Sequence, residues 1–252
     1  MSEFAAGPVG RIERVRALMA ERGYDAIVVR DEANLRWLTG VKGVFDYTFE
    51  FPHAAFITAD QCLFHTDSRY LNSFEENTSA GSPWVYDMDE GTISGWVAGK
   101  IAANKCRVCA VEDDMQINFY QGIQRGLEDR SVACMLPLMH DDIRKMRAIK
   151  DAEEIELMRH AQSITDAAFQ HMLGFIKPGM TEKPVRNELE NFMFANGADS
   201  LAFGSIVASG PNTANPHAVP SDRVIEKGDF VLMDYGAGYC DYRSDMTRTV
   251  VM

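Results

Sequence analysis

The sequence predicts an α/β domain over residues 1–142, followed by an α+β segment over residues 143–252. Three observations support this fold class. Helical and strand patterns alternate through the first half of the chain. A charged helical stretch begins at Asp141, and after Asn196 and Gly197 strand patterns continue to Met252. The length of 252 residues suits one large domain or two small ones.

The first half begins with apolar residues at helical spacing, and Gly23 ends that helix before a strand. In chain order we expect a helix over 11–22, a strand over 25–29, a hairpin of strands 54–58 and 62–65, a helix over 93–103, a strand over 107–111, a helix over 117–127 and a strand over 132–139. Strands separated by helices indicate a mixed sheet with helices covering it.

The second half begins with a long amphipathic helix from Ala152, whose apolar positions recur through Met172. The segment KPGM (residues 177–180) ends it, and Thr181 is the expected N-cap of another helix.

Charge and composition exclude some classes of partner. The net charge of −12 argues against a nucleic-acid partner, because a phosphate-binding face needs clustered Lys and Arg. The N-terminus has no basic segment followed by an apolar run, and no stretch is long enough to span a bilayer. We therefore expect a cytoplasmic protein without a membrane partner, in which the acidity favours solubility.

The five cysteines include Cys106 and Cys109, whose spacing is that of a redox or zinc pair. They lie in a strand pattern, in which positions three apart point to opposite faces. No second pair completes a four-ligand zinc site, so we expect buried, reduced thiols.

Two aspartates, Asp234 and Asp245, flank a predicted hairpin turn. If the turn is centred between Tyr239 and Cys240, the two aspartates are direct cross-strand neighbours, with Cβ atoms about 4.5–5.5 Å apart. Like charges placed so are destabilising unless a proton or a cation lies between them, and carboxylates suit Mn, Mg or Zn. The alternative is a pair of solvated aspartates balanced by Arg243 or Arg248.

His217 lies between Pro216 and Pro220, in a segment that we expect to be a loop. A histidine in a loop is more often a solvated polar residue than a catalytic one. Its role therefore depends on its neighbours.

Several segments resemble the Xaa-Pro aminopeptidases and prolidases. In the second half these are VASGPNTANPHAVPSDR (207–223), GDFVLMDYGA (228–237) and SDMTRT (244–249). Further segments, NLRWLTG (34–40), TDSRY (66–70) and MRAIKDAEEIELMR (146–159), extend the resemblance over nearly the whole chain.

The resemblance implies a creatinase-type N-terminal domain followed by a pita-bread metallopeptidase domain that holds two divalent ions, Mn, Co or Zn. By motif, Asp234 corresponds to a ligand of one metal, Asp245 to the aspartate that bridges both, and His217 to the histidine that contacts the substrate. The implied substrate is a proline-containing peptide cleaved at an Xaa-Pro bond, and the implied assembly is a homodimer.

The sequence departs from this family in one respect. Family members continue with a histidine and two glutamate ligands, whereas no His or Glu follows Glu226 here. We therefore expect an incomplete pita-bread domain, truncated at the C-terminus and inactive by itself. Two alternatives stay open: a catalytically dead pita-bread module for binding or dimerisation, and a metal-free creatinase-like amidinohydrolase.

Overall fold

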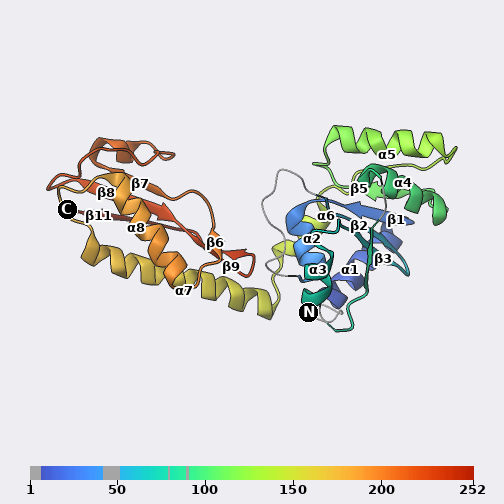
Figure 1. Ribbon diagram of the computed structural model, residues 1–252, viewed down its shortest axis with the longest axis horizontal. Coiled ribbons are helices and arrows are strands. Elements are labelled where there is room, and N and C mark those ends of the chain that lie inside the picture. The colour runs from blue at the N-terminus through green and yellow to red at the C-terminus, as the bar shows by residue number, and fades with distance from the viewer. Residues whose placement is uncertain (1–6, 42–51, 79, 89–90) are drawn as a thin grey trace. The chain divides into compact units, whose positions relative to one another are not determined.

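The computed structural model describes residues 7–41, 52–78, 80–88 and 91–252 (Figure 1). The chain divides into two units, Met1–Asp151 and Ala152–Met252. Each unit has its own strands and its own apolar core.

The first unit is built on a five-stranded sheet in the order β4-β3-β2-β1-β5. Its strands are β1 (Ala26–Val29), β2 (Ala54–Thr58), β3 (Cys62–His65), β4 (Trp84–Asp87) and β5 (Cys109–Val111). β1 is parallel to β5 and β3 is parallel to β4, whereas β2 is antiparallel to both of its neighbours. The predicted mixed sheet is thus confirmed.

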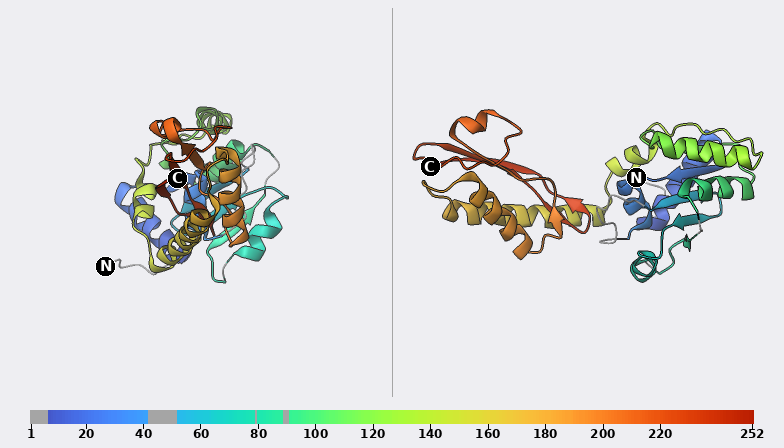
Figure 2. Two further views of the ribbon diagram at one scale, coloured as in Figure 1. Left: turned by 90° about the vertical axis from the view of Figure 1, so that its left-hand side faces the viewer. Right: turned by 45° about the horizontal axis from the view of Figure 1, so that its top comes forward.

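Helices cover both faces of this sheet. Alternate side chains of β1 point to opposite faces and pack in two different cores. Ile27 and Val29 pack in a core with α1 (Gly7–Arg22), α2 (Glu32–Thr39), α3 (Leu71–Asn77) and α6 (Asp142–Ala148). Ala26 and Val28 pack on the other face with α4 (Ile93–Ala103) and α5 (Ile117–Asp129). Figures 1 and 2 show these two helical layers on opposite sides of the strands.

The predicted strand over residues 132–139 is wrong as a regular strand. The segment forms only isolated parallel bridges. Met135 bridges Val108, which directly precedes β5, and Leu138 bridges Val111 of β5. Pro137 lies between the bridging residues and has no N–H to donate, which interrupts a continuous ladder. Its carbonyl still accepts from the Val111 N–H at 2.9 Å.

The two units of the structure divide after Asp151, and the predicted domain boundary at residue 142 stays a prediction. The short helix α6 lies beyond the predicted boundary, but Ile143 is buried in the core of the first unit and Met146 packs against it. Arg147 Nη1 donates to Asn34 Oδ1 at 2.7 Å, and Arg11 pairs with Asp151 at 2.9 Å. These contacts fix the charged stretch to the first unit.

The second unit packs two helices against one side of its strands (Figure 2). The elements are α7 (Ala152–Phe175), α8 (Glu182–Ala195), β6 (Ser200–Leu201), β7 (Ile206–Ser209), the 3-10 helix η1 (Gly210–Ala214), β8 (Phe230–Tyr235), β9 (Ala237–Tyr239), β10 (Tyr242–Arg243) and β11 (Met246–Val251). The strands form two sheets, β11-β8-β7 and β10-β9-β6. Val231, Met233 and Tyr235 of β8 are fully buried in the core shared with both helices.

Within the described ranges, no helix is both long and apolar enough to cross a membrane. The five cysteines are free thiols, and Cys62, Cys106 and Cys109 are buried.

Candidate functional site

The hairpin that carries the two aspartates turns at Cys240 and Asp241. Both residues have left-handed backbone conformations, with φ of 46° and 68°. The N–H of Cys240 donates to Asp199 Oδ2 at 2.7 Å, which helps to fix the turn. Tyr239 therefore pairs with Tyr242.

This turn shifts the register away from the predicted one. Asp234 pairs with Thr247, not with Asp245, so the predicted direct pairing is wrong. The prediction placed the centre of the turn one residue too early, between Tyr239 and Cys240, whereas the structure has it between Cys240 and Asp241. Two consecutive left-handed residues form the tight two-residue turn that suits the twist of a hairpin, and they set its centre.

Asp234 and Asp245 nevertheless lie on the same face of the hairpin. Tyr235 pairs with Met246, and both side chains are buried in the core. Asp234 precedes Tyr235 and Asp245 precedes Met246, so alternation turns both carboxylates away from that core. They are diagonal neighbours, which in a regular sheet lie about 7–8 Å apart.

The surroundings of the two carboxylates differ. Asp234 is half-buried and accepts a hydrogen bond from Thr247 Oγ1 at 2.8 Å. Asp245 is exposed. Thr247 therefore orients one carboxylate while the other is open to solvent or to a cation.

His217 lies on an exposed part of the loop between η1 and β8. Its backbone N–H donates to Asn215 Oδ1 at 3.1 Å. None of the hydrogen bonds among the described residues joins His217 to Asp234 or Asp245. The structure thus brings the two aspartates onto one face but does not link the histidine to them.

The donor types at this hairpin suit a hard divalent cation. Carboxylate oxygens are suitable ligands for Mn, Mg or Zn. In the part of the chain that the structure describes, no group of three His, Cys, Asp or Glu side chains is arranged to hold a metal ion. The incomplete metal site expected from the sequence stays a prediction.

Glu182, at the first position of α8, forms a buried hydrogen-bonding centre that the sequence analysis missed. Its side chain is fully buried. Ser209 donates to Oε1 through both its N–H and its hydroxyl, at 2.7 and 2.9 Å. Ser221 donates to Oε2 in the same two ways, at 2.8 and 2.6 Å, and Asn212 Nδ2 donates to both oxygens.

Burial raises the pKa of Glu182, but the hydrogen bonds from Ser221, Asn212 and Ser209 outweigh it. The net pKa lies below its usual value, so the carboxylate is ionised at neutral pH. Its donors come from residues 27 to 39 positions further along the chain. Contacts between residues so far apart leave no local pattern in the sequence. Only the start of the helix at Thr181 could therefore be predicted, and not the hydrogen bonds of Glu182.

An ion pair adjoins this centre. Arg223 Nη1 donates to Asp229 Oδ2 at 2.6 Å and to Ser209 Oγ at 2.7 Å. The hydrogen bond that Arg223 donates to Asp229 holds the pKa of Asp229 below its usual value and raises the pKa of Arg223. Asp229, Arg223, Ser209 and Glu182 are thus connected in one chain of hydrogen bonds.

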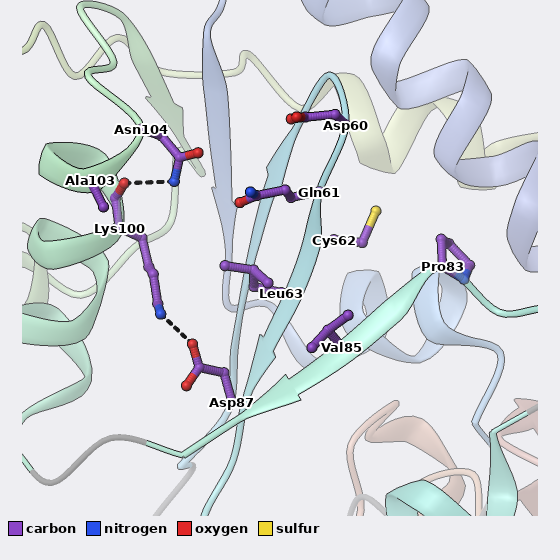
Figure 3. Close-up of a pocket in the computed structure, with 10 residues that line it drawn as sticks. All are labelled: Asp60, Gln61, Cys62, Leu63, Pro83, Val85, Asp87, Lys100, Ala103 and Asn104. Atoms are coloured by element: carbon purple, nitrogen blue, oxygen red, sulfur yellow. Dashed lines mark hydrogen bonds and ion pairs between the residues drawn. The ribbon is translucent and has the colours of Figure 1, made fainter.

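The first unit contains its own cavities. One, of about 490 Å³, lies beside β3, β4 and the end of α4 (Figure 3). There the Lys100 ammonium pairs with Asp87, and Asn104 Nδ2 donates to the Lys100 carbonyl at 2.9 Å. The residues that line this cavity all belong to the first unit, so it includes none of the three predicted site residues.

A second cavity of about 260 Å³ is lined by acidic residues and by Arg144 and Arg147. Glu112 is one of its lining residues; it is buried and accepts from the backbone N–H groups of Arg30 and Asp31 and from Asn34 Nδ2. Burial raises the pKa of Glu112 to about 7 in spite of these hydrogen bonds.

The fold and the hairpin together define a class of protein. It has an α/β domain followed by part of an α+β domain, in which two aspartates lie on one face of a hairpin. Residues 11–149 match the Creatinase/Prolidase N-terminal domain, and residues 156–252 match Metallopeptidase family M24. The chain belongs to the creatinase and prolidase group of M24 metallopeptidases.

Similar proteins agree with this assignment. The chain is 34% identical over 249 residues to the uncharacterized peptidase YqhT of Bacillus subtilis, covering 96% of this chain and 65% of that protein. It is 45% identical over 112 residues to an Xaa-Pro dipeptidase of Pyrococcus furiosus, covering 44% of this chain and 32% of that protein. An Xaa-Pro dipeptidase structure from Bacillus anthracis matches with a TM-score of 0.86 and 33% identity, over 98% of this chain and 65% of that one.

The chain therefore spans about 65% of the length of the relatives that match it from end to end. Both domain matches lie in the order that the resemblance implies. The predicted fold class, a creatinase-type domain followed by an incomplete pita-bread domain, is confirmed.

Proposed function

We propose that this chain is part of a cytoplasmic, metal-dependent peptidase that cleaves Xaa-Pro bonds. The observation that carries the proposal is the placement of Asp234 and Asp245 on one face of a hairpin, inside the segment that matches Metallopeptidase family M24. The names of the similar dipeptidases support a proline-containing peptide as the substrate.

In this proposal Asp234 and Asp245 would be ligands of divalent ions, Mn, Co or Zn. The chemistry that a bound cation supplies in such a site is polarisation of the scissile carbonyl and a lowered pKa of a water molecule. Thr247 has a supporting role, because its hydroxyl donates to Asp234 and fixes one carboxylate oxygen.

His217 is the proposed substrate contact beside the scissile bond. It is exposed, and its backbone N–H donates to Asn215 Oδ1. An imidazole can donate to or accept from the substrate backbone, which suits a residue that orients a peptide carbonyl.

The 252 residues by themselves are proposed to be inactive, because the described residues offer no third ligand. The same observation favours the second candidate function, a pita-bread module used for binding or dimerisation. A metal-free amidinohydrolase is disfavoured, because such an enzyme has no need for the aspartate pair.

An assay with Mn²⁺ or Co²⁺ separates these possibilities. The polypeptide encoded by the whole gene is expected to hydrolyse Xaa-Pro peptides only when metal is added, whereas the 252-residue chain is expected to show little or no turnover. Robust metal-dependent turnover by the 252-residue chain would refute the incomplete-site interpretation. Inactivity of both polypeptides would favour the binding module.

A homodimer is the proposed assembly. The strand β11 is at the edge of its sheet, and Phe230 and Val251, which pair across β8 and β11, are 58% and 63% exposed. Exposed apolar residues on an edge strand favour association. Light scattering is expected to show a mass above that of one chain, and a monomer at high concentration would contradict the proposal.

A further inference from the structure

We propose that Glu182 is a positioning residue that holds both ends of the loop carrying His217. This inference rests on the proposed function, in which His217 contacts the substrate. The loop is defined as residues 210–221, which begin with η1 and end at Ser221.

The geometry divides the two carboxylate oxygens between the two ends of the loop. Oε1 accepts from Ser209, which directly precedes the loop, and Oε2 accepts from Ser221, its last residue. Asn212 donates to Oε1 at 3.0 Å and to Oε2 at 3.3 Å. One side chain thus links backbone positions on both sides of His217.

Between Asn212 and Ala218 the backbone hydrogen bonds of the loop are local. Asn215 N–H donates to the Asn212 carbonyl, and Ala218 N–H donates to the Asn215 carbonyl, each at 3.1 Å. Ala218 and Pro220 are buried, whereas residues 214–217 are exposed. The exposed tip therefore depends on its two ends for its position.

The charge of Glu182 strengthens this link. A fully buried carboxylate that accepts only from neutral N–H, O–H and amide groups depends on all of them for its solvation. Arg223 donates to Ser209 Oγ, which leaves the hydroxyl hydrogen of Ser209 directed at Glu182. The orientation of Ser209 is thereby fixed from both sides.

The substitution Glu182→Gln tests the link with little change in size. The amide replaces one accepting oxygen by an NH₂ group, which cannot accept from the donors at that end of the loop. The matched control is Glu188→Gln, on the same helix. The carboxylate of Glu188 bonds His171 of α7 at 2.6 Å, and among the described residues no hydrogen bond joins it to the loop.

Hydrogen exchange of the 252-residue chain measures the positioning without any need for activity. In Glu182→Gln the amides of Ser209, Ala218 and Ser221 are expected to exchange at least about tenfold faster, while those of Val231 and Met233 stay within about twofold. Glu188→Gln is expected to leave the loop amides unchanged. Unchanged loop exchange, or equal acceleration throughout the sheet, would overturn the proposal.

Kinetics of the whole gene product supply the second readout. Glu182→Gln is expected to lower kcat by at least about tenfold at an unchanged Mn²⁺ requirement, because the metal ligands are not altered. Ser221→Thr, which keeps the hydroxyl, is expected to retain more activity than Ser221→Ala. Faster loop exchange with an unchanged kcat would contradict the proposal that Glu182 positions the loop for catalysis. An inactive wild type would instead refute the proposed function. The hydrogen-exchange result would then still test whether Glu182 holds the two ends of the loop.

Discussion

Two buried glutamates, Glu112 in the first unit and Glu182 in the second, show how the number of donors decides the state of a carboxyl group. Glu112 accepts three hydrogen bonds, and burial still raises its pKa to about 7. Glu182 accepts from two hydroxyls, two backbone N–H groups and one amide, and its pKa is lowered. The extra donors compensate for the lost hydration.

The raised pKa of Glu112 predicts a pH-dependent stability of the first unit. Between pH 4.5, the ordinary pKa, and about 7, the folded chain holds a proton on Glu112 that the unfolded chain has lost. Stability therefore falls as pH rises through this window, by an amount on the order of 3 kcal/mol for this group. Chemical denaturation followed at pH 4.5, 5.5 and 7 measures the slope.

The variant Glu112→Gln isolates this contribution, since an amide does not titrate. Its free energy of unfolding is expected to change less with pH over the same window than that of the wild type. Equal slopes for the two proteins would show that Glu112 is ionised in the folded state and would contradict the predicted titration.

Gly210, at the start of the His217 loop, has φ of +47°. A Cβ atom there would lie 2.5 Å from Arg223 Nη2 and 2.7 Å from Asp229 Oδ1. Gly210→Ala is therefore expected to lower the free energy of unfolding by about 1–3 kcal/mol. Gly174→Ala in α7, where a Cβ meets nothing within 4 Å, is expected to raise it by about 0.5–1 kcal/mol. Denaturant midpoints for both variants provide the comparison.

At the scale of single elements, the turn of the aspartate hairpin offers a separate test. Cys240 has a Cβ in the left-handed region, where glycine is favoured. Cys240→Gly is expected to stabilise the second unit by about 0.5–1 kcal/mol. Cys240→Ala keeps the Cβ and removes only the thiol, so it is expected to stay close to the wild type. Stabilisation of equal size in both variants would attribute the effect to the thiol instead of the backbone.

The sequence predicts best the elements that depend only on the periodicity of their apolar residues. The hairpin strands Ala54–Thr58 and Cys62–His65 and the helix Ile93–Ala103 have the predicted bounds. The register of the aspartate hairpin was not predictable, because its centre depends on two left-handed residues that are neither Gly nor Asn. The segment 132–139 carries apolar residues that suit a strand, but Pro137 limits its pairing.

The candidate site was predictable only in part, for a related reason. Motifs identify Asp234, Asp245 and His217 as candidates. Alternation places both aspartates on one face even though the register differs by two residues, because an even shift keeps the face of each side chain. Glu182 was missed because its hydrogen bonds join α8 to a loop far along the chain. Tertiary contacts of this kind follow from packing and leave no local sequence pattern.

At the scale of the whole molecule, the chain consists of two units with separate cores, each matching one domain family. The end-to-end relatives extend beyond the matched region, since the chain covers 65% of their length. We therefore propose that the second unit, and not the α/β domain of the first, supplies the aspartate hairpin and the His217 loop to a larger site.

The most direct test of this account is the Mn²⁺-dependent hydrolysis of an Xaa-Pro dipeptide by the whole gene product and its aspartate variants. Asp234→Asn and Asp245→Asn are each expected to lower kcat/KM by at least about a hundredfold. Asp166→Asn, which alters an α7 carboxylate that bonds Gln162 of the same helix, is expected to leave it unchanged. Retention of wild-type, metal-dependent activity by either hairpin variant would contradict the assignment of this hairpin as part of the metal centre.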